Sequence, residues 1–230
     1  MCRLLAVWGV DLKSQIAEIL DQFQELSSGG QAPHGWGLVA FRGEQIVFLR
    51  KKHMAAITDA DYSEAARKIE GFNPTLVVGH LRRSALGIKG AHPFWGGRLV
   101  FCHNGSMLGS NAIPLTSDYE KMRRGGTGAE RFFLYLLQLY QEEGERAIAS
   151  AINYVRDNHS YRALNFILTD GRILWAVREA NKSHEHYSLY RGQKDNDKLG
   201  AVCSEPLLIP HIKWEMIDNH FISREEVVAA

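Results

Sequence analysis

The second residue of the chain is a cysteine that directly follows Met1. Because cysteine is small, a methionine aminopeptidase could remove Met1 and leave Cys2 with both a free thiol and a free α-amine. The α-amine has an ordinary pKa of about 7.7–8.0, so much of it is neutral near pH 7 and can take the proton of the thiol. A terminal amine that activates an adjacent nucleophile is an established route to covalent catalysis. Cys2 is therefore a candidate nucleophile, although a buried structural cysteine is the commoner occupant of a first strand.

Polar residues that could serve such a nucleophile gather at the ends of predicted strands. Asn104 and Gly105 follow the strand expected over 98–103, where a side-chain amide and a glycine N–H can converge on one oxyanion. The alternative is an ordinary Asn-Gly turn. Arg82 ends the β-branched run 75–82, and its guanidinium could grip a substrate carboxylate or pair with a buried acid.

Four histidines invite a metal hypothesis, but their spacing matches no compact zinc signature. They are His34, His80, His92 and His103. His92 precedes Pro93, which predicts an extended backbone, and its side chain could orient a substrate or stiffen a loop. The glycine-rich stretch 125–128 is a weak signal for an anion site. We expect neither a metal nor a cofactor.

Composition and charge exclude several functional classes. The 230 residues include 45% hydrophobic and 23% charged side chains, which is ordinary for a soluble globular protein. The formal net charge is +1, so bulk charge predicts neither a nucleic-acid nor a membrane partner. No apolar run approaches the ~20 residues of a membrane helix. The three cysteines are too few for a disulfide framework, which predicts a reducing, cytoplasmic compartment.

The hydrophobic pattern predicts strands toward both ends of the chain and a helix pair between them. Helices are expected over 13–26, 62–70, 130–142 and the stretch after Gly144. Strands are expected over 3–8, 36–42, 45–50, 75–82, 98–103, 164–169, 172–177, 186–191 and 199–203. This order lacks the regular βαβα alternation of a parallel sheet. It predicts an α+β protein with antiparallel sheets under packed helices, and a loose loop over 109–128.

Taken together, these motifs resemble the class II glutamine amidotransferases, which are N-terminal nucleophile hydrolases. The matching elements occur in the family order: Met1-Cys2-Arg3, Gly35-Trp36-Gly37, His80-Leu81-Arg82, His92-Pro93-Phe94, His103-Asn104-Gly105, Leu164-Asn165-Phe166 with Asp170-Gly171, and Ser204-Glu205-Pro206-Leu207 with Trp214. Each motif is weak alone, but the ordered set that begins at Cys2 is specific. The similarity is closest to small stand-alone members, of the kind represented by the γ-glutamyl amide hydrolase of ergothioneine biosynthesis. It implies a single domain over 1–230 with a four-layer αββα sandwich of two mainly antiparallel sheets.

The resemblance also implies roles for individual residues. It makes Cys2 the nucleophile, with its own amine as the base, and makes Asn104 and Gly105 the oxyanion hole. It makes Arg82 the clamp on the α-carboxylate of the substrate, with His92 near the same cleft. The implied reaction is hydrolysis of a small-molecule glutamine or γ-glutamyl amide through a thioester, which releases ammonia or an amine. We expect no attached synthase domain, so ammonia would need a separate synthase as its acceptor or would diffuse away. Association into a homo-oligomer stays open.

Two positions depart from the family pattern. In the family, an aspartate in a Thr-Asp-Ser-Glu motif pairs with the α-ammonium of glutamine. The aligned stretch here reads Thr127-Gly128-Ala129-Glu130, so Gly128 replaces that counter-charge in the substrate-binding site. Asp118 could substitute if its loop folds inward, since a buried ammonium without a partner is costly. The second departure is His34, where relatives tend to have aspartate.

Three functional hypotheses follow. The first is a cysteine amidohydrolase that acts on glutamine or a γ-glutamyl amide. The second is a catalytically silent binding or regulatory homologue, which the loss of the aspartate at Gly128 motivates. The third is an N-terminal cysteine hydrolase whose substrate is a non-glutamine amide with no α-ammonium to neutralise. Turnover of a panel of amides, with Cys2→Ala as the comparison, would separate them.

Overall fold

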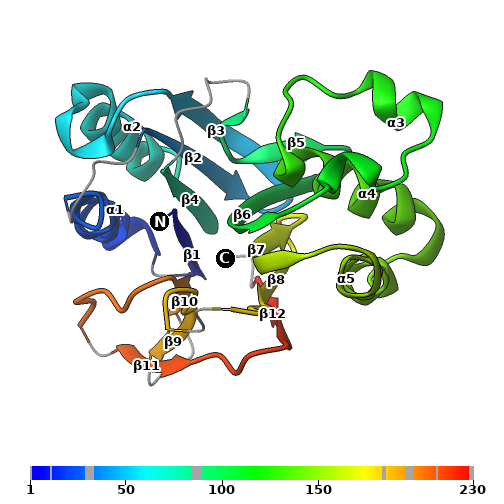
Figure 1. Cartoon of the computed structure of the whole chain (residues 1–230). Helices are drawn as coiled ribbons and strands as arrows, with labels where there is room; N and C mark the ends of the chain where they lie inside the picture. The colour runs from blue at the N-terminus through cyan, green and yellow to red at the C-terminus, as the bar shows by residue number, and fades with distance from the viewer. Residues whose placement is uncertain are drawn as a thin grey trace.

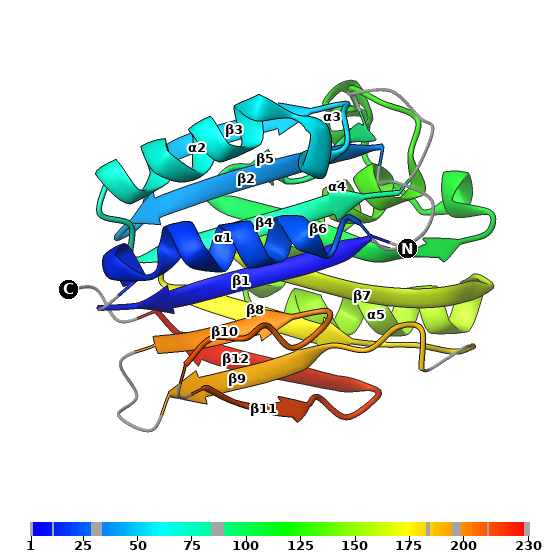
Figure 2. The ribbon, with the colours of Figure 1, turned by 90° about the vertical axis from the view of Figure 1, so that its left-hand side faces the viewer.

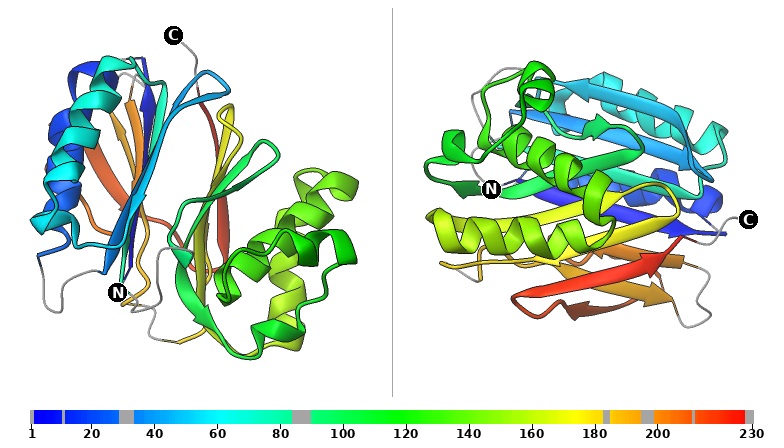
Figure 3. Two further views of the ribbon diagram at one scale, coloured as in Figure 1. Left: turned by 90° about the horizontal axis from the view of Figure 1, so that it is seen from above. Right: turned by 90° about the vertical axis from the view of Figure 1, so that its right-hand side faces the viewer.

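Two antiparallel sheets lie face to face in this protein, and helices cover the outer face of each sheet (Figure 1). The computed structural model describes residues 2–10, 12–28, 34–83, 90–182, 185–194, 199–210 and 212–227. Seen from above, the layers run helix, sheet, sheet, helix (Figure 3, left). The four-layer αββα arrangement expected from the sequence is confirmed.

The larger sheet has seven strands in the order β11-β9-β10-β1-β4-β2-β3. Its strands are β1 (Arg3–Gly9), β2 (Gly35–Arg42), β3 (Gln45–Lys52), β4 (Leu76–Arg82), β9 (Tyr190–Lys194), β10 (Leu199–Cys203) and β11 (Ile212–Met216). Two helices, α1 (Ile16–Glu25) and α2 (Ala60–Gly71), lie across its outer face (Figure 2). The central strands β1 and β4 are buried on both faces, which is why they read as continuous apolar runs in the sequence.

The smaller sheet has five strands in the order β12-β8-β7-β6-β5. Its strands are β5 (Phe94–Gly96), β6 (Leu99–Met107), β7 (Tyr161–Thr169), β8 (Ile173–Arg178) and β12 (Phe221–Glu226). The helices α4 (Gly128–Glu143) and α5 (Arg146–Asn158) pack on its outer face (Figure 3, right). None of the helices in the described ranges combines the length and the apolar character needed to cross a bilayer.

Side chains of β1 alternate between two cores. Leu5 and Val7 pack under α1 and α2. Leu4 and Ala6 pack in the core between the two sheets. Because successive side chains of a strand point to opposite faces, Cys2 shares the inter-sheet face with Leu4 and Ala6.

The neighbouring strand β4 alternates in the same way. Val78 packs between the sheets, so His80 and Arg82 lie on the inter-sheet face as well. The pairing register sets Leu4 of β1 opposite His80 of β4. Arg82 is buried, and Arg83, which directly follows the strand, is exposed.

Edge strands account for most differences between the expected and the observed elements. The strand expected over 186–191 begins only at Tyr190, because 185–187 form a turn. The strands β5, β11 and β12 were not expected: β5 is short, and β11 and β12 carry exposed charged side chains that interrupt any apolar run. The loop expected over 109–128 contains a 3₁₀ turn at Ser110–Ala112 and the short helix α3 (Ser117–Lys121).

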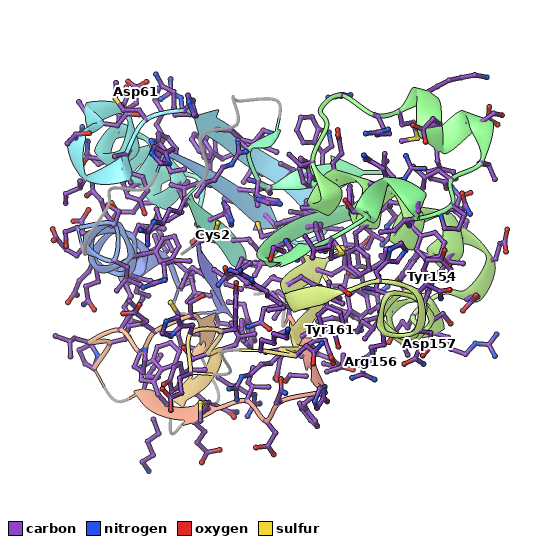
Figure 4. All side chains as sticks on the ribbon, viewed as in Figure 1. Cys2, Asp61, Tyr154, Arg156, Asp157 and Tyr161 are labelled. Carbon is purple, nitrogen blue, oxygen red and sulfur yellow. The ribbon has the colours of Figure 1, made fainter. Side chains whose placement is uncertain are left out.

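A buried carboxylate, that of Glu179, links helix α5, strand β7 and the segment before β12. The side chain of Glu179, which follows β8, is 1% exposed and forms an ion pair with Arg156 of α5. It accepts a 2.6 Å hydrogen bond from the hydroxyl of Tyr161 and lies 2.9 Å from Nδ1 of His220. Arg156 and Tyr161 mark this junction of α5 and β7 in Figure 4. Burial opposes ionisation of Glu179, but these hydrogen bonds hold its pKa below the ordinary value.

Replacement of Glu179 by alanine should lower the free energy of unfolding by about 2–3 kcal/mol. The change strands the buried Tyr161 hydroxyl, whereas the partly exposed Arg156 can still reach water, so the loss stays below the about 3–5 kcal/mol of a fully buried pair. Urea denaturation measures the change. Glu145→Ala is the matched control: its carboxylate pairs with Arg224 at the surface, and the loss should stay below about 1 kcal/mol. Equal losses in the two variants would contradict the assignment.

Candidate active site

The start of β1 is held by a residue from the far end of the chain. Ser204 directly follows β10, and its hydroxyl accepts a 2.9 Å hydrogen bond from the N–H of Leu4. The N–H of Ser204 in turn donates to the carbonyl of Leu4 at 3.0 Å. Two hydrogen bonds to one residue fix the backbone next to Cys2, which lies between the two sheets (Figure 4). Ser204 belongs to a motif noted in the sequence, but its role in positioning β1 was not expected.

Cys2 opens into a cavity of about 340 Å³. The walls come from the ends of β1, β4 and β6, from residues 90 and 92, and from the start of α4. Five of the six site residues predicted from the sequence line this cavity: Cys2, Arg82, His92, Gly105 and Gly128. The sixth, Asn104, does not line it. Segments that are far apart in the sequence therefore meet at one small chamber.

The environment of the Cys2 thiol keeps it protonated. Burial raises the pKa of the thiol, while the N–H of Arg83, which lies 3.4 Å from Sγ, and the positive charges of Arg82 and Arg3 act in the opposite direction. The net shift is upward. A thiol in this state needs a base before it can attack a carbonyl carbon.

Three buried histidines stand around the chamber, and all three are neutral. The ring centroid of His92 lies 4.3 Å from that of His80 and 6.4 Å from that of His103. Burial lowers the pKa of His80 to about 3 and that of His103 to about 4, and it holds the pKa of His92 well below the ordinary value. Such weakly basic rings are poor acceptors for the proton of a thiol whose pKa is raised. His103, which the sequence places in the His-Asn-Gly motif and among the four histidines, lines the cavity.

Asn104 and Gly105 occupy different faces of β6. Cys102 packs in the core between the sheets, so Asn104, two residues later, also turns toward the larger sheet and is 4% exposed. Cys2 occupies the inter-sheet face of the opposing sheet. At Gly105, an added Cβ would lie 1.8 Å from the carbonyl oxygen of Ala163, so only glycine fits beside β7. Packing alone therefore requires this glycine, whatever its part in chemistry.

Arg82 closes the chamber on the side of β4. Its side chain is 4% exposed, and a Cβ added at Gly90 would lie 3.0 Å from its Nη2 atom, so the segment after residue 89 runs directly over the guanidinium. His34, the second position that departs from the family pattern, is exposed and contacts this region through a backbone hydrogen bond, in which its N–H donates to the carbonyl of Arg82 at 2.6 Å.

Gly128 is the first residue of α4 and has no room for a side chain. A Cβ added there would lie 2.5 Å from Oγ and 2.8 Å from Cβ of Ser110. The helix is capped by Thr127, whose hydroxyl accepts a 3.2 Å hydrogen bond from the N–H of Glu130. Ser110 thus fills the volume that a residue with a side chain would need. Nothing in the sequence pairs Ser110 with Gly128, because the contact joins a loop to a helix.

The two acidic residues considered near this helix start, Glu130 and Asp118, have partners outside the cavity. The carboxylate of Glu130 accepts the N–H of Arg124 at 2.8 Å and that of Gly125 at 2.9 Å. Asp118 is 87% exposed and pairs with Lys121 at 3.3 Å. The suggestion that Asp118 folds inward as a counter-charge is therefore wrong: α3 carries it on the outer surface. In the described part of the chain, no aspartate or glutamate lines the cavity.

Replacement of Gly128 by alanine should lower the free energy of unfolding by about 1–3 kcal/mol through overpacking against Ser110. The sign is informative, because alanine is otherwise the better helix former by about 1 kcal/mol. Ser110→Gly in the same protein should recover most of the loss, and chemical denaturation of the four proteins completes the cycle. Gly126→Ala is the control, since a Cβ there meets open space. A Gly128→Ala variant as stable as the parent would refute the close contact.

Acid should destabilise the protein through the neutral histidines. The unfolded chain binds protons at histidine below about pH 6.5, whereas folded His80 and His103 resist protonation down to about 3 and about 4. The free energy of unfolding should therefore fall as the pH drops from about 6.5 toward 4, by about 1.4 kcal/mol per pH unit for each histidine. His103→Asn should make the profile shallower, and exposed His53→Asn should leave it unchanged. If the free energy of unfolding fell with pH equally in the parent, His103→Asn and His53→Asn, the neutral state of His103 would not be the cause of the acid sensitivity.

Comparisons with known proteins place the chain in a family. The family model for class II glutamine amidotransferases matches residues 1–193. A class II glutamine aminotransferase domain protein from Silicibacter pomeroyi shares the fold with a TM-score of 0.67 and 18% identity, over 98% of this chain and 99% of that one. A predicted glutamine amidotransferase from Pseudomonas aeruginosa matches with a TM-score of 0.58 and 17% identity, over 97% and 92% of the two chains.

A larger enzyme contains the same fold. The glutamine phosphoribosylpyrophosphate amidotransferase of Bacillus subtilis, solved with ADP and GMP, matches all of this chain with 50% of its own length, a TM-score of 0.61 and 14% identity. Among curated proteins, no sequence matches at a significant level. The structural likeness establishes the fold, and the family model extends over most of the sequence. The chain belongs to the class II glutamine amidotransferases.

Proposed function

We propose that this protein is an amidohydrolase whose nucleophile is Cys2 and whose substrate is a small amide cleaved through a thioester. The observation that carries the proposal is that the Cys2 thiol opens into the same 340 Å³ cavity as Arg82 and Gly105. A chamber of this size suits a small molecule rather than a polypeptide. Membership of the amidotransferase family supports an amide as the group that is attacked.

The first half of the reaction would run from the amine of Cys2. Once Met1 is removed, the neutral α-amine takes the thiol proton, and the thiolate attacks the amide carbonyl carbon. The carbonyl oxygen becomes an oxyanion, for which the Asn104 side-chain amide and the Gly105 N–H are the proposed donors. The C–N bond breaks as the amine returns its proton to the leaving nitrogen, which departs as ammonia or an amine.

Water completes the reaction. The α-amine takes a proton from a water molecule that attacks the thioester, and the C–S bond breaks to release a carboxylic acid and restore the thiol. Arg82 would hold a carboxylate at the far end of the substrate by two parallel hydrogen bonds, and His92 would orient the chain between them. The weak basicity of the three buried histidines supports the amine, rather than an imidazole, as the base.

We also propose that residues 1–230 act as one functional domain. The protein would work in a reducing, cytoplasmic compartment, where Cys2 stays a thiol. Ammonia released in the chamber would pass to a separate synthase or diffuse away. The kinship with the γ-glutamyl amide hydrolase of ergothioneine biosynthesis stays a prediction from sequence resemblance.

Covalent labelling tests the nucleophile directly. A chloroketone analogue of an acyl amide should add once per protein, at Cys2, and intact mass should show a mature chain that begins at Cys2. Cys2→Ala should abolish both labelling and amide hydrolysis. Cys203→Ala is the control: burial raises the pKa of that thiol to about 12, so its loss should leave labelling unchanged.

Two outcomes would overturn the mechanism. One is full activity in protein that retains Met1, and the other is hydrolysis that survives in Cys2→Ala. Absence of both labelling and turnover across a panel of amides would instead favour the silent binding homologue, which the lack of an acidic residue in the described cavity lining motivates.

A further inference from the structure

The charged side chains in the described lining of the chamber are all positive. Glutamine presents three groups to its binding site: the amide that is cleaved, an α-carboxylate and an α-ammonium. Among the described lining residues the charged side chains are Arg82 and Arg83, so the chamber offers a partner for the carboxylate and repels the ammonium. A substrate that enters such a chamber with an ammonium group would lose its hydration without gaining a counter-charge.

In the described part of the chain, the acidic residues considered as counter-charges are held by other partners. Glu130 is 5% exposed and its carboxylate is bound to two backbone N–H groups, and Asp118 is held on the outer surface. Glu205, near the start of β1, pairs with Arg3. The segments 29–33 and 84–89 contain neither aspartate nor glutamate. Glu130, Asp118 and Glu205 therefore each have a partner outside the substrate chamber.

The helix start adds to the positive potential. The 16-residue helix α4 begins at Gly128, which lines the cavity, so the positive end of the helix dipole points toward the chamber. Thr127 satisfies the N–H of Glu130, whereas the preceding N–H groups of the first turn have no acceptor within the helix. Ser110 leaves no room for a side chain at Gly128, so no acidic side chain at that position can offset the positive end of the helix dipole.

Two buried, neutral histidines offer ring nitrogens that could hydrogen-bond a substrate. His92 is 6% exposed and neither of its ring nitrogens has a hydrogen-bond partner in the described part of the protein; the same holds for Nε2 of His103, which is 4% exposed. Both side chains line the cavity. Neutral imidazoles can hydrogen-bond a carbonyl or a carboxylate, but they bring no negative charge with which to balance an ammonium.

We infer that the substrate of this chamber is the monoamide of a dicarboxylic acid, with a carboxylate for Arg82 and the helix start and with no ammonium group. This inference rests on the proposed function and narrows its substrate class. The reaction consumes one water molecule and converts the amide to a second carboxylate plus ammonia. A protein with this preference would act on deaminated, oxidised or otherwise amine-free relatives of glutamine rather than on glutamine itself.

Four amides that share a butanamide skeleton separate the two charges. Glutamine carries carboxylate and ammonium, glutaramate carries the carboxylate alone, 4-aminobutanamide carries the ammonium alone, and butanamide carries neither. With the full-length protein, kcat/KM should be highest for glutaramate and at least about tenfold lower for glutamine, because of the unpaired ammonium. Arg82→Met should bring glutaramate down to the level of butanamide. Turnover of glutamine equal to or above that of glutaramate would overturn the inference and leave the proposed hydrolase standing.

Binding separates failure of the inference from failure of the mechanism. Calorimetric titration of Cys2→Ala with glutaramate and with glutamine reports substrate preference without turnover. Tighter binding of glutaramate with no hydrolysis by the parent protein would support the substrate class and defeat the proposed reaction. Tighter binding of glutamine would defeat the substrate class.

Asp118→Asn provides the matched control. Because Asp118 lies on the outer surface, the ratio of glutamine to glutaramate turnover should not change in this variant. A selective loss of glutamine turnover would show that α3 brings a counter-charge to the substrate, and would overturn the inference.

Discussion

The antiparallel register between β1 and β4 is the constraint on which the site depends. Arg3 pairs with Leu81 and Leu4 pairs with His80, so continuation by one residue sets Cys2 opposite Arg82. The Cys2 thiol and the Arg82 guanidinium then share one face and open toward the second sheet. A slip of one residue would turn every side chain of β1 to the other face and bury the thiol under α1. The two hydrogen bonds between Leu4 and Ser204, and the fit of Leu4 and Ala6 in one core and of Leu5 and Val7 in the other, oppose that slip.

The sequence predicted the inner strands and the helices well, because burial leaves long apolar or periodic runs. The edge strands β5, β11 and β12 escaped prediction, since exposure breaks those runs with charged residues. Five residues were predicted from residue type, from strand position or from the order of family motifs, and the structure places all five around one cavity: Cys2, Arg82, His92, Gly105 and Gly128. Ser110 could not be found, because its contact with Gly128 depends on how a loop returns to the start of a helix.

The described walls of the chamber carry neither an acidic side chain nor a strong base. Its walls include neutral histidines, the capped start of α4 and one buried arginine. None of these groups is a strong base that could take the proton of the Cys2 thiol. The close approach of the Ala163 carbonyl requires glycine at position 105. The same position carries the backbone N–H that we propose as an oxyanion donor. The same histidines make the fold sensitive to acid, so the polarity of the site and the stability of the fold are coupled.

The hydrogen bonds between Leu4 and Ser204 join residues 200 positions apart. Synthesis on the ribosome makes β1 well before the residue that fixes its start, which is added 200 positions later. Until β10 pairs with β1, the segment that carries Cys2 has one edge open and its backbone unsecured. Such distant pairing is slow to form, because the entropy of a long loop must be lost before the contact is gained. Completion of the chamber is therefore a late event in folding, and the thiol gains its surroundings only once β10 and Ser204 are in place.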